Sequence, residues 1–284
     1  MNDDSPLKLQ GITKNYQEFH LGPIDLEVPR GYVMGLVGAN GAGKTTAIKA
    51  MLGMVGIDAG SISVLDGAPG ARHGRIGVVL DRLALSRDWT AVSAARSLER
   101  FYPDWDRDLL DDLLTRLDVP ARVKIKDLSR GQGVKLALAL ALAHSPELLI
   151  LDEPTSGLDP VARLEVLDIF RDFLIAEGRT VLFSTHITSD LDRIADMVTI
   201  LDAGRVIASG SREDLLETWV MVRGGVADLT DGLNSRVRGL RRHSVGWEGL
   251  LPAADLGLCG PGVVAETPSI EELLVHLAKE RKDA

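Results

Sequence analysis

The chain has 284 residues, of which 45% are hydrophobic and 26% charged, so we expect one large globular domain with a smaller one. Its net charge of -9 argues against a protein that binds many phosphates of DNA or RNA, because such proteins usually present a basic surface. The single cysteine, Cys259, excludes an internal disulfide framework and fits a reducing compartment.

The acidic first residues do not resemble a secretory signal, and apolar runs that predict β-strands follow them. These runs cover residues 7–14, 24–28, 33–37, 61–65 and 76–80. The run at 76–80 is apolar nearly throughout, as expected of a strand buried on both faces, and runs at 148–151 and 181–183 repeat that pattern. Because helical segments lie between these runs, we expect parallel strands with covering helices.

Residues 90–143 are mostly helical and contain no convincing strand. Leucines at helical spacing form one apolar face that is typical of a core, at Leu109, Leu110, Leu113, Leu114 and Leu117. A helical subdomain, at about residues 88–145, is therefore inserted between two halves of the sheet. A helix at 161–176 follows, and strands at 198–201 and 205–208 form a hairpin.

The pattern changes near Trp219, where glycines become frequent and apolar runs shorten. A last amphipathic helix covers residues 270–279. We therefore divide the chain into a main domain over residues 1–218, which contains the helical subdomain, and a small α/β domain over residues 219–284. Since the longest strongly apolar stretch is too short to cross a bilayer, any membrane role is expected to come through a partner.

Residues 38–45 match the phosphate-binding pattern G-x-x-x-x-G-K-[ST] and lie between an apolar run and a helix-like run. Glycines let the backbone turn its N–H groups inward as an anion cradle, at which the following helix directs its positive end. Lys44 is expected to reach the β- and γ-phosphates of a nucleotide, and the Thr45 hydroxyl to ligate Mg²⁺. The predicted nucleotide-binding residues of this loop are Gly38, Asn40, Gly41, Ala42, Gly43, Lys44, Thr45 and Thr46.

The apolar strand at 148–151 ends in two acids, Asp152 and Glu153. Two acids directly after a strand that is buried on both faces are unusual, so they indicate a function at the carboxyl edge of the sheet. Asp152 is placed to hold Mg²⁺, directly or through water, and Glu153 to orient or deprotonate an attacking water. The alternative is a helix cap after a core strand, because Pro154 and Thr155 follow.

With these motifs, the chain resembles the ATP-binding subunit of ABC transporters from about residue 7 to residue 215. Residues 128–132, L-S-R-G-Q, look like the LSGGQ signature of the family, and residues 156–159 look like its D-loop. The resemblance implies an α/β P-loop NTPase fold with a mixed sheet, a helical insert and a C-terminal extension. It also assigns nucleotide contacts to Ser129, Gly131 and Gln132.

Two single residues also match the family. His186, after the strand at 180–184, looks like the switch histidine that contacts the γ-phosphate, and the alternative is a polar loop histidine. Tyr16 stands where the family has an aromatic residue that stacks on adenine, and the alternative is a partly buried residue at a strand end. The catalytic residues implied are Lys44, Glu153 and His186.

The resemblance further implies hydrolysis of ATP with Mg²⁺ by two subunits packed head to tail, as a homodimer or a heterodimer. Each ATP lies between the phosphate loop of one subunit and the signature of the other. By the same resemblance, the subunits energise a separate membrane permease at the cytoplasmic face of the membrane. The amino-acid sequences of the motifs are most like those of bacterial drug- and bacitracin-type exporters. No nucleic-acid partner is expected.

The chain departs from the family at two positions. Asp81 stands where the family usually has Gln after a strand, so it is either a metal ligand or only the start of a loop. Arg130 replaces a glycine of the signature and can reach a phosphate, pair with an acid across the dimer or point to solvent.

Aromatic residues gather between positions 83 and 106, in a chain that is only 4% aromatic, at Trp89, Phe101, Tyr102 and Trp105, with Pro103 among them. They form either an anchor surface for the permease or the core of the helical insert. Two other functions stay open: a soluble ABC ATPase that acts on nucleic acid or ribosomes, and a non-hydrolysing ATP-driven regulatory clamp. A basic cluster at residues 236–242 would support the former, and the intact Glu153 argues against the latter.

Overall fold

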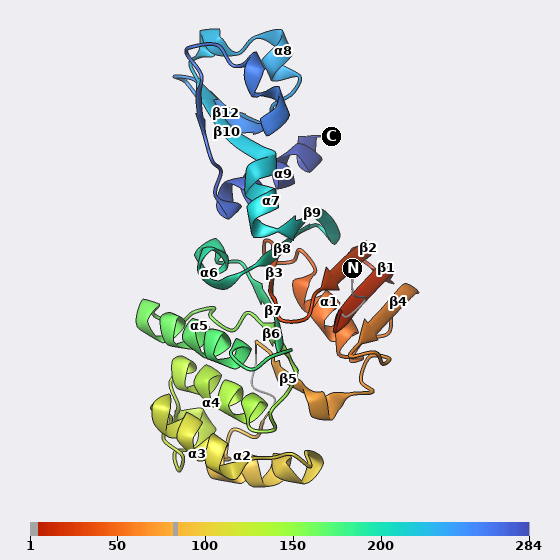
Figure 1. Cartoon of the computed structure of the whole chain (residues 1–284), viewed down its shortest axis with the longest axis vertical. Helices are drawn as coiled ribbons and strands as arrows, with labels where there is room; N and C mark the ends of the chain where they lie inside the picture. Colours follow the sequence, from red (N-terminus) through yellow and green to blue (C-terminus); the bar gives the residue numbers. More distant parts are fainter. Residues whose placement is uncertain (1–4, 82–84, 284) are drawn as a thin grey trace.

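The computed structural model describes residues 5–81 and 85–283, with the backbone alone at residues 279–283. Residues 83 and 84, which belong to the region proposed for permease contact, lie outside the described residues. The molecule is elongated, with the C-terminal domain at one end, the helical subdomain at the other and the main β-sheets between them (Figure 1).

A six-stranded mixed sheet forms the centre of the main domain, as predicted. Its order is β5 (Ile76–Val79), β6 (Leu148–Asp152), β7 (Thr180–Thr185), β3 (Val33–Val37), β8 (Met197–Asp202) and β9 (Arg205–Ser211). The first five strands are parallel, and β9 joins β8 in the predicted antiparallel hairpin. Because the carboxyl ends of parallel strands meet at one edge, the segments that follow β3, β5, β6 and β7 converge there.

A second sheet consists of β1 (Leu7–Asn15), β2 (His20–Val28) and β4 (Ala59–Val64) in the order β2-β1-β4. Both pairings are antiparallel, so the prediction of parallel strands was wrong for this part of the chain. For β1 and β2 the physical reason is the short link between them, because adjacent parallel strands require a crossover of a dozen or more residues.

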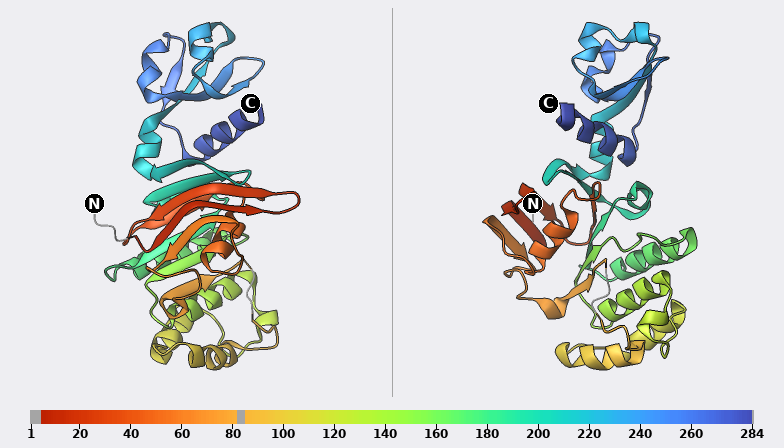
Figure 2. Two further views of the ribbon diagram at one scale, coloured as in Figure 1. Left: turned by 90° about the vertical axis from the view of Figure 1, so that its right-hand side faces the viewer. Right: turned by 180° about the vertical axis from the view of Figure 1, so that it is seen from behind.

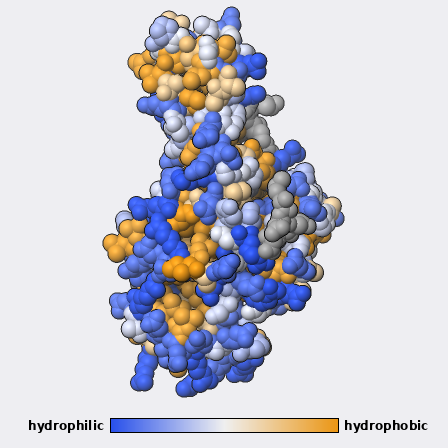
Figure 3. Space-filling view, in the orientation of Figure 1, coloured by the Kyte–Doolittle hydropathy of each residue, from blue (hydrophilic) through white to orange (hydrophobic). Residues whose placement is uncertain are grey.

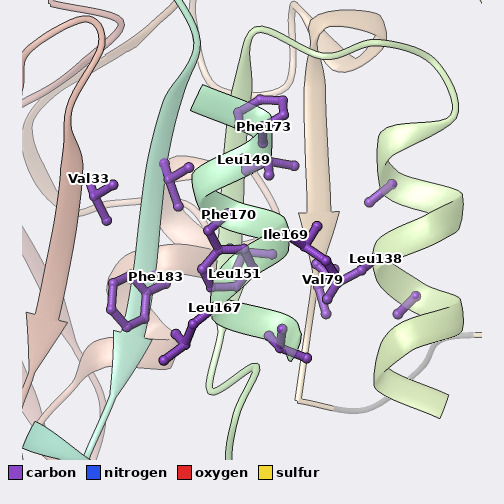
Figure 4. Close-up of a cluster of buried hydrophobic side chains, with 14 of the residues drawn as sticks. Val33, Val79, Leu138, Leu149, Leu151, Leu167, Ile169, Phe170, Phe173 and Phe183 are labelled. Carbon is purple, nitrogen blue, oxygen red and sulfur yellow. The ribbon is translucent and has the colours of Figure 1, made fainter. Parts of the chain in front are cut away.

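Helices cover both faces of the central sheet. Helix α1 (Lys44–Met51) lies between the two sheets, whereas α4 (Arg130–Leu142), α5 (Pro160–Leu174) and α6 (Thr188–Ile194) cover the opposite face. Alternate residues of β6 enter the two cores: Leu148 and Ile150 pack on the α1 side, and Leu149 and Leu151 pack on the α5 side (Figure 4). This burial on both faces explains the nearly continuous apolar sequence of the strand.

The helical subdomain comprises α2 (Ala91–Leu98), α3 (Arg107–Arg116) and α4. The predicted leucine face is confirmed, since Leu110, Leu113, Leu114 and Leu117 are buried and Leu109 is partly buried. Side chains of the expected types cap its helices: Thr90 caps α2, Asp106 caps α3, and Ser129 caps α4. Single 3₁₀ turns lie at η1 (His73–Arg75), η2 (Glu99–Phe101) and η3 (Ile125–Asp127).

The C-terminal domain follows α7 (Arg212–Thr218), which the Ser211 side chain caps. Its sheet has the order β11 (Arg238–Arg242), β12 (Trp247–Pro252), β10 (Trp219–Gly224) and β13 (Val264–Glu266). Its other elements are α8 (Asp231–Asn234), α9 (Ile270–Asp283), η4 (Val226–Asp228) and η5 (Ala253–Leu258). Figure 2 shows α9 between this sheet and the main domain. Ile270 and Leu273 of α9 join the core that contains Leu191 of α6, so the two domains share apolar packing.

We expect Phe170→Ala to destabilise the main domain strongly. Phe170 on α5 is fully buried, and its ring centroid lies 6.0 Å from that of Phe183 on β7. Loss of such a ring typically lowers the free energy of unfolding by about 3–5 kcal/mol, through lost burial and the cavity left behind. Urea denaturation measures the change. The control is Val161→Ala on the same helix, where the side chain is 67% exposed, and an equal loss in both variants would contradict this packing.

Candidate functional site

A cleft of about 830 Å³ opens at the carboxyl edge of the central sheet. Of the sequence-predicted residues, Asn40 to Thr46, Asp81, Asp152, Glu153 and His186 line it. Phe19, Lys49, Leu80 and Ser156 also line it and were not predicted. The predicted residues thus come together from four separate parts of the chain, as parallel strand ends require, and Phe19 adds a fifth part.

The phosphate loop is held by close backbone approaches. Gly43 caps α1 with a φ of 109°, a conformation that L side chains rarely adopt, and no side chain bonds the first N–H groups of the helix. At Gly38, a Cβ atom would lie 2.3 Å from the Leu201 carbonyl oxygen of β8, so only glycine fits there. The start of α1 therefore offers N–H groups to an anion in the cleft.

Lys44 is only 5% exposed, and oxygen atoms surround its buried ammonium group. Its Nζ donates to the carbonyl oxygens of Gly38 at 2.7 Å and Ala39 at 3.3 Å. It also lies 3.0 Å from Oε1 of Glu153. These contacts stabilise a buried positive charge at the mouth of the anion cradle.

Asp152 is 1% exposed and accepts two hydroxyl hydrogen bonds. The Thr45 hydroxyl donates to its Oδ2 at 2.8 Å, and the Ser184 hydroxyl donates to its Oδ1 at 2.6 Å. Thr45 and Asp152 therefore place two hard oxygen atoms side by side at the cleft, which fits Mg²⁺. The described residues contain no cluster of three or more His, Cys, Asp or Glu side chains arranged for a metal, so phosphate and water oxygens would complete the coordination.

Glu153 connects the other predicted catalytic residues. It has a positive φ of 52°, and its N–H donates to the Ser184 carbonyl at 3.2 Å and hydroxyl at 3.0 Å. Its Oε2 lies 2.6 Å from Nδ1 of His186. Because an ionised carboxylate only accepts hydrogen bonds, Nδ1 carries the proton. Lys44, Glu153 and His186 thus form one continuous polar chain.

A buried group behind the cleft links the segments after β6 and β7. Thr155 donates to Oδ2 of the fully buried Asp190 at 2.6 Å, and Arg163 lies 3.9 Å from its Oδ1. Burial raises the pKa of Asp190, an effect that the Thr155 hydrogen bond and the Arg163 charge oppose.

At the start of α5, backbone N–H groups of Ala162 and Val161 hold the pKa of Asp159 below its ordinary value, as expected of a cap.

Five predicted nucleotide contacts, Gly38 among them, do not line this cleft. Tyr16 is 48% exposed in the turn between β1 and β2, whereas Phe19 of the same turn lines the cleft. Ser129, Gly131 and Gln132 lie at the start of α4, where Ser129 and Gln132 form a reciprocal capping box. Their nucleotide contacts therefore stay predictions that require a second subunit.

The side chains at the two positions that depart from the family pattern, Asp81 and Arg130, form an ion pair with each other. Nη2 of Arg130 lies 3.7 Å from Oδ1 of Asp81 in the same chain. This partner was not among the alternatives considered for Arg130, because a sequence does not show which loop faces the start of a helix.

Comparison with known proteins places this geometry in a family. The family model described as ABC transporter matches residues 21–156. The chain is 37% identical over 225 residues to "Nod factor export ATP-binding protein I" of Burkholderia thailandensis, covering 75% of this chain and 73% of that protein. The protein of the same name from Cupriavidus pinatubonensis is 35% identical over 225 residues, covering 75% of this chain and 69% of its own length.

The chain belongs to the ATP-binding subunits of ABC transporters. A solved "ATP binding subunit of ABC transporter" superposes with a TM-score of 0.68 at 28% identity, over 74% of this chain and 92% of that chain. An ATP-binding cassette in a dimeric post-hydrolysis state, bound to ADP and Pi, shares the fold with a TM-score of 0.65 at 23% identity, over 72% and 98% of the two chains. The P-loop NTPase fold expected from the motifs is therefore confirmed.

This ABC subunit has no helix, within residues 5–81 and 85–283, that is long and apolar enough to span a bilayer.

One residue that sequence reasoning missed is Ser184, the last but one residue of β7. Its hydroxyl bonds both Asp152 and the N–H of Glu153, so it holds the two acids at once. A polar residue at the end of an otherwise apolar strand was the available signal, whereas its position beside Asp152 is known only from the structure.

We expect Ser184→Ala to weaken the magnesium-dependent step of nucleotide binding. Without the hydroxyl, Oδ1 of the buried Asp152 loses its donor, which typically costs about 1–3 kcal/mol. Chemical denaturation should show that loss, and the Mg²⁺ concentration for half-maximal nucleotide binding should rise. Ser97→Ala on α2, outside the cleft, is the control. Identical Mg²⁺ titrations of Ser184→Ala and the unaltered chain would contradict this role.

Proposed function

We propose that this protein hydrolyses ATP with Mg²⁺ and thereby energises a separate membrane permease that exports its substrate. The observation that carries the proposal is the connected set of Lys44, Glu153 and His186 beside the oxygens of Thr45 and Asp152. The names of the relatives, which refer to export, support the direction of transport. The protein would then act at the cytoplasmic face of the membrane, through the permease.

The geometry supports in-line attack of water on the γ-phosphate. A γ-phosphate that enters the cradle competes with Glu153 for Lys44, and the carboxylate that it frees can accept a proton from water. The water oxygen bonds to the γ-phosphorus while the bond to the β–γ bridging oxygen breaks, which releases ADP and inorganic phosphate. His186 keeps Glu153 oriented through Nδ1 and can turn Nε2 towards the γ-phosphate. Thr45 and Asp152 would hold Mg²⁺, which would supply positive charge to neutralise the phosphates.

A head-to-tail dimer would complete the site. The start of α4 carries Ser129 in an exposed position, outside the cleft of its own subunit. A second copy, or a related subunit, can bring this helix start to the nucleotide as an additional anion site. Asp159, exposed at the start of α5, is available to the same interface.

The permease is proposed to dock beside the helical subdomain. An apolar cavity of about 250 Å³ lies between β5 and the helices α2 and α4, lined among others by Leu85, Leu98 and Tyr102. Tyr102 stacks at 4.2 Å on the buried His144, whose pKa is lowered by that burial. Phe101 beside it is 71% exposed, so the aromatic cluster is divided between core and surface.

The hydropathy of the surface supports a protein partner at part of the helical subdomain. Its charge gives little support to the binding of nucleic acid. Figure 3 shows a largely hydrophilic face, with hydrophobic residues gathered over the C-terminal domain and in a narrower strip over the helices. The basic cluster of the C-terminal domain is matched by acids, since Arg236 lies 3.9 Å from Asp255 and Arg241 lies 3.4 Å from Glu248. Such pairs leave less positive charge for a phosphate backbone.

We expect Glu153→Gln to lower ATP turnover by at least about a hundredfold, because the amide cannot accept the proton of the attacking water. ATP should then remain bound between two subunits, so the variant should form a stable dimer with ATP and Mg²⁺. Phosphate release and size-exclusion chromatography measure the two effects. The matched control is Glu165→Gln on α5, which pairs with Lys135 away from the cleft. Unchanged turnover would remove Glu153 from the role of base.

We expect Phe101→Ala to uncouple the subunit from its permease. Anchor residues of this kind typically contribute about 2 kcal/mol or more to an interface, which corresponds to roughly thirtyfold weaker binding. Basal ATP turnover of the isolated subunit should stay unchanged, while stimulation by the detergent-purified permease from a neighbouring gene should fall. Val226→Ala, at a position that is 69% exposed on the C-terminal domain, is the control. Equal stimulation in both variants would exclude Phe101 from the contact.

A further inference from the structure

The ion pair between Asp81 and Arg130 crosses from the main domain to the helical subdomain. Asp81 follows the end of β5 and lines the nucleotide cleft. Arg130 is the first residue of α4, and its Nη2 lies 3.7 Å from Oδ1 of Asp81. The two positions at which this chain departs from its family are therefore partners, although they lie far apart in the sequence.

Arg130 makes a second contact with the main domain. Its guanidinium lies over Gly157, in the segment between β6 and α5. A Cβ atom at Gly157 would approach Cζ of Arg130 to 2.9 Å, and the φ of this glycine is +69°. One side chain at the start of α4 thus touches two segments that border the nucleotide cleft.

The position of Arg130 is electrostatically unfavourable without a partner. The N-terminus of a helix carries partial positive charge, and the first turn of α4 contains no acid. Asp81 supplies the missing negative charge from outside the helix. The two side chains are 56% and 52% exposed, so the pair is open to water and its formation is reversible.

We propose that Asp81 and Arg130 form a positioning pair that fixes the start of α4, and with it Ser129, relative to the nucleotide cleft of the same subunit. The proposal rests on the proposed function, in which Ser129 meets ATP held by a second subunit. A change in the tilt of α4 displaces Ser129 but leaves Lys44 and Glu153 in place. The pair therefore acts on the closure of two subunits around ATP, and not on nucleotide binding by one.

The test uses the full chain carrying Glu153→Gln, in which sedimentation velocity gives the ATP concentration for half-maximal dimerisation. Arg130→Gln and Asp81→Asn should each raise that concentration. An exposed ion pair contributes about fivefold at most, so two copies in the dimer give an increase of up to about twenty-five-fold. Combining both substitutions should add little further. The charge reversal Asp81→Arg with Arg130→Asp should recover part of the loss.

Two measurements separate this role from general tethering and from metal binding. Arg116→Gln breaks a comparably exposed pair with Asp172, between α3 and α5, and should leave dimerisation unchanged. A fluorescent ATP analogue with Mg²⁺ should bind the isolated Arg130→Gln chain as tightly as the unaltered chain. The increase in the ATP concentration for dimerisation should shrink at high salt, because screening weakens exposed pairs.

Several results would overturn the positioning pair. These are unchanged dimerisation in Arg130→Gln, additive effects of the two single substitutions, or an equal effect of Arg116→Gln. A higher Mg²⁺ requirement in Asp81→Asn, with normal dimerisation in Arg130→Gln, would assign Asp81 to the metal instead. Failure of the unaltered chain to bind the analogue would overturn the proposed function, and the pair with it.

Discussion

The ion pair between Lys44 and Glu153 is the interaction on which the candidate site depends. A buried ammonium without a counter-charge is costly, and the phosphate loop must hold Lys44 inside the protein before any phosphate arrives. Glu153 supplies that charge from the end of β6, which β7 separates from β3 in the sheet. The cation is therefore already oriented when an anion enters, and under the proposed mechanism the Glu153 carboxylate becomes available at the same moment.

This arrangement follows from the parallel sheet. The loop that carries Lys44 follows β3, the two acids end or follow β6, and His186 follows β7. Because these three strands are hydrogen-bonded neighbours in the order β6-β7-β3, their following residues lie close together without long loops. Ser184 strengthens the connection, since it bonds both acids across the strand pair. Rigid strands thus set the distances that the chemistry needs.

Much of this could be predicted from the sequence, because the signals were local. The apolar run before Asp152 and the glycines before Lys44 each depend on a few adjacent residues. The antiparallel sheet, the place of Phe19 in the cleft and the partner of Arg130 could not be predicted in the same way. They depend on which segments meet in space, and periodicity along the chain carries no information on that. Ser184 lies between these cases, since its polarity was visible but its partners were not.

The docking of α9 on α6 has a practical consequence for handling the protein. Leu191 and Ala195, at the end of the segment that begins with His186, share one apolar core with Leu273. A fragment shortened before β10 would leave this face of α6 in water, close to His186. Such a fragment is therefore prone to aggregation, and its failure in an assay would say little about the intact enzyme.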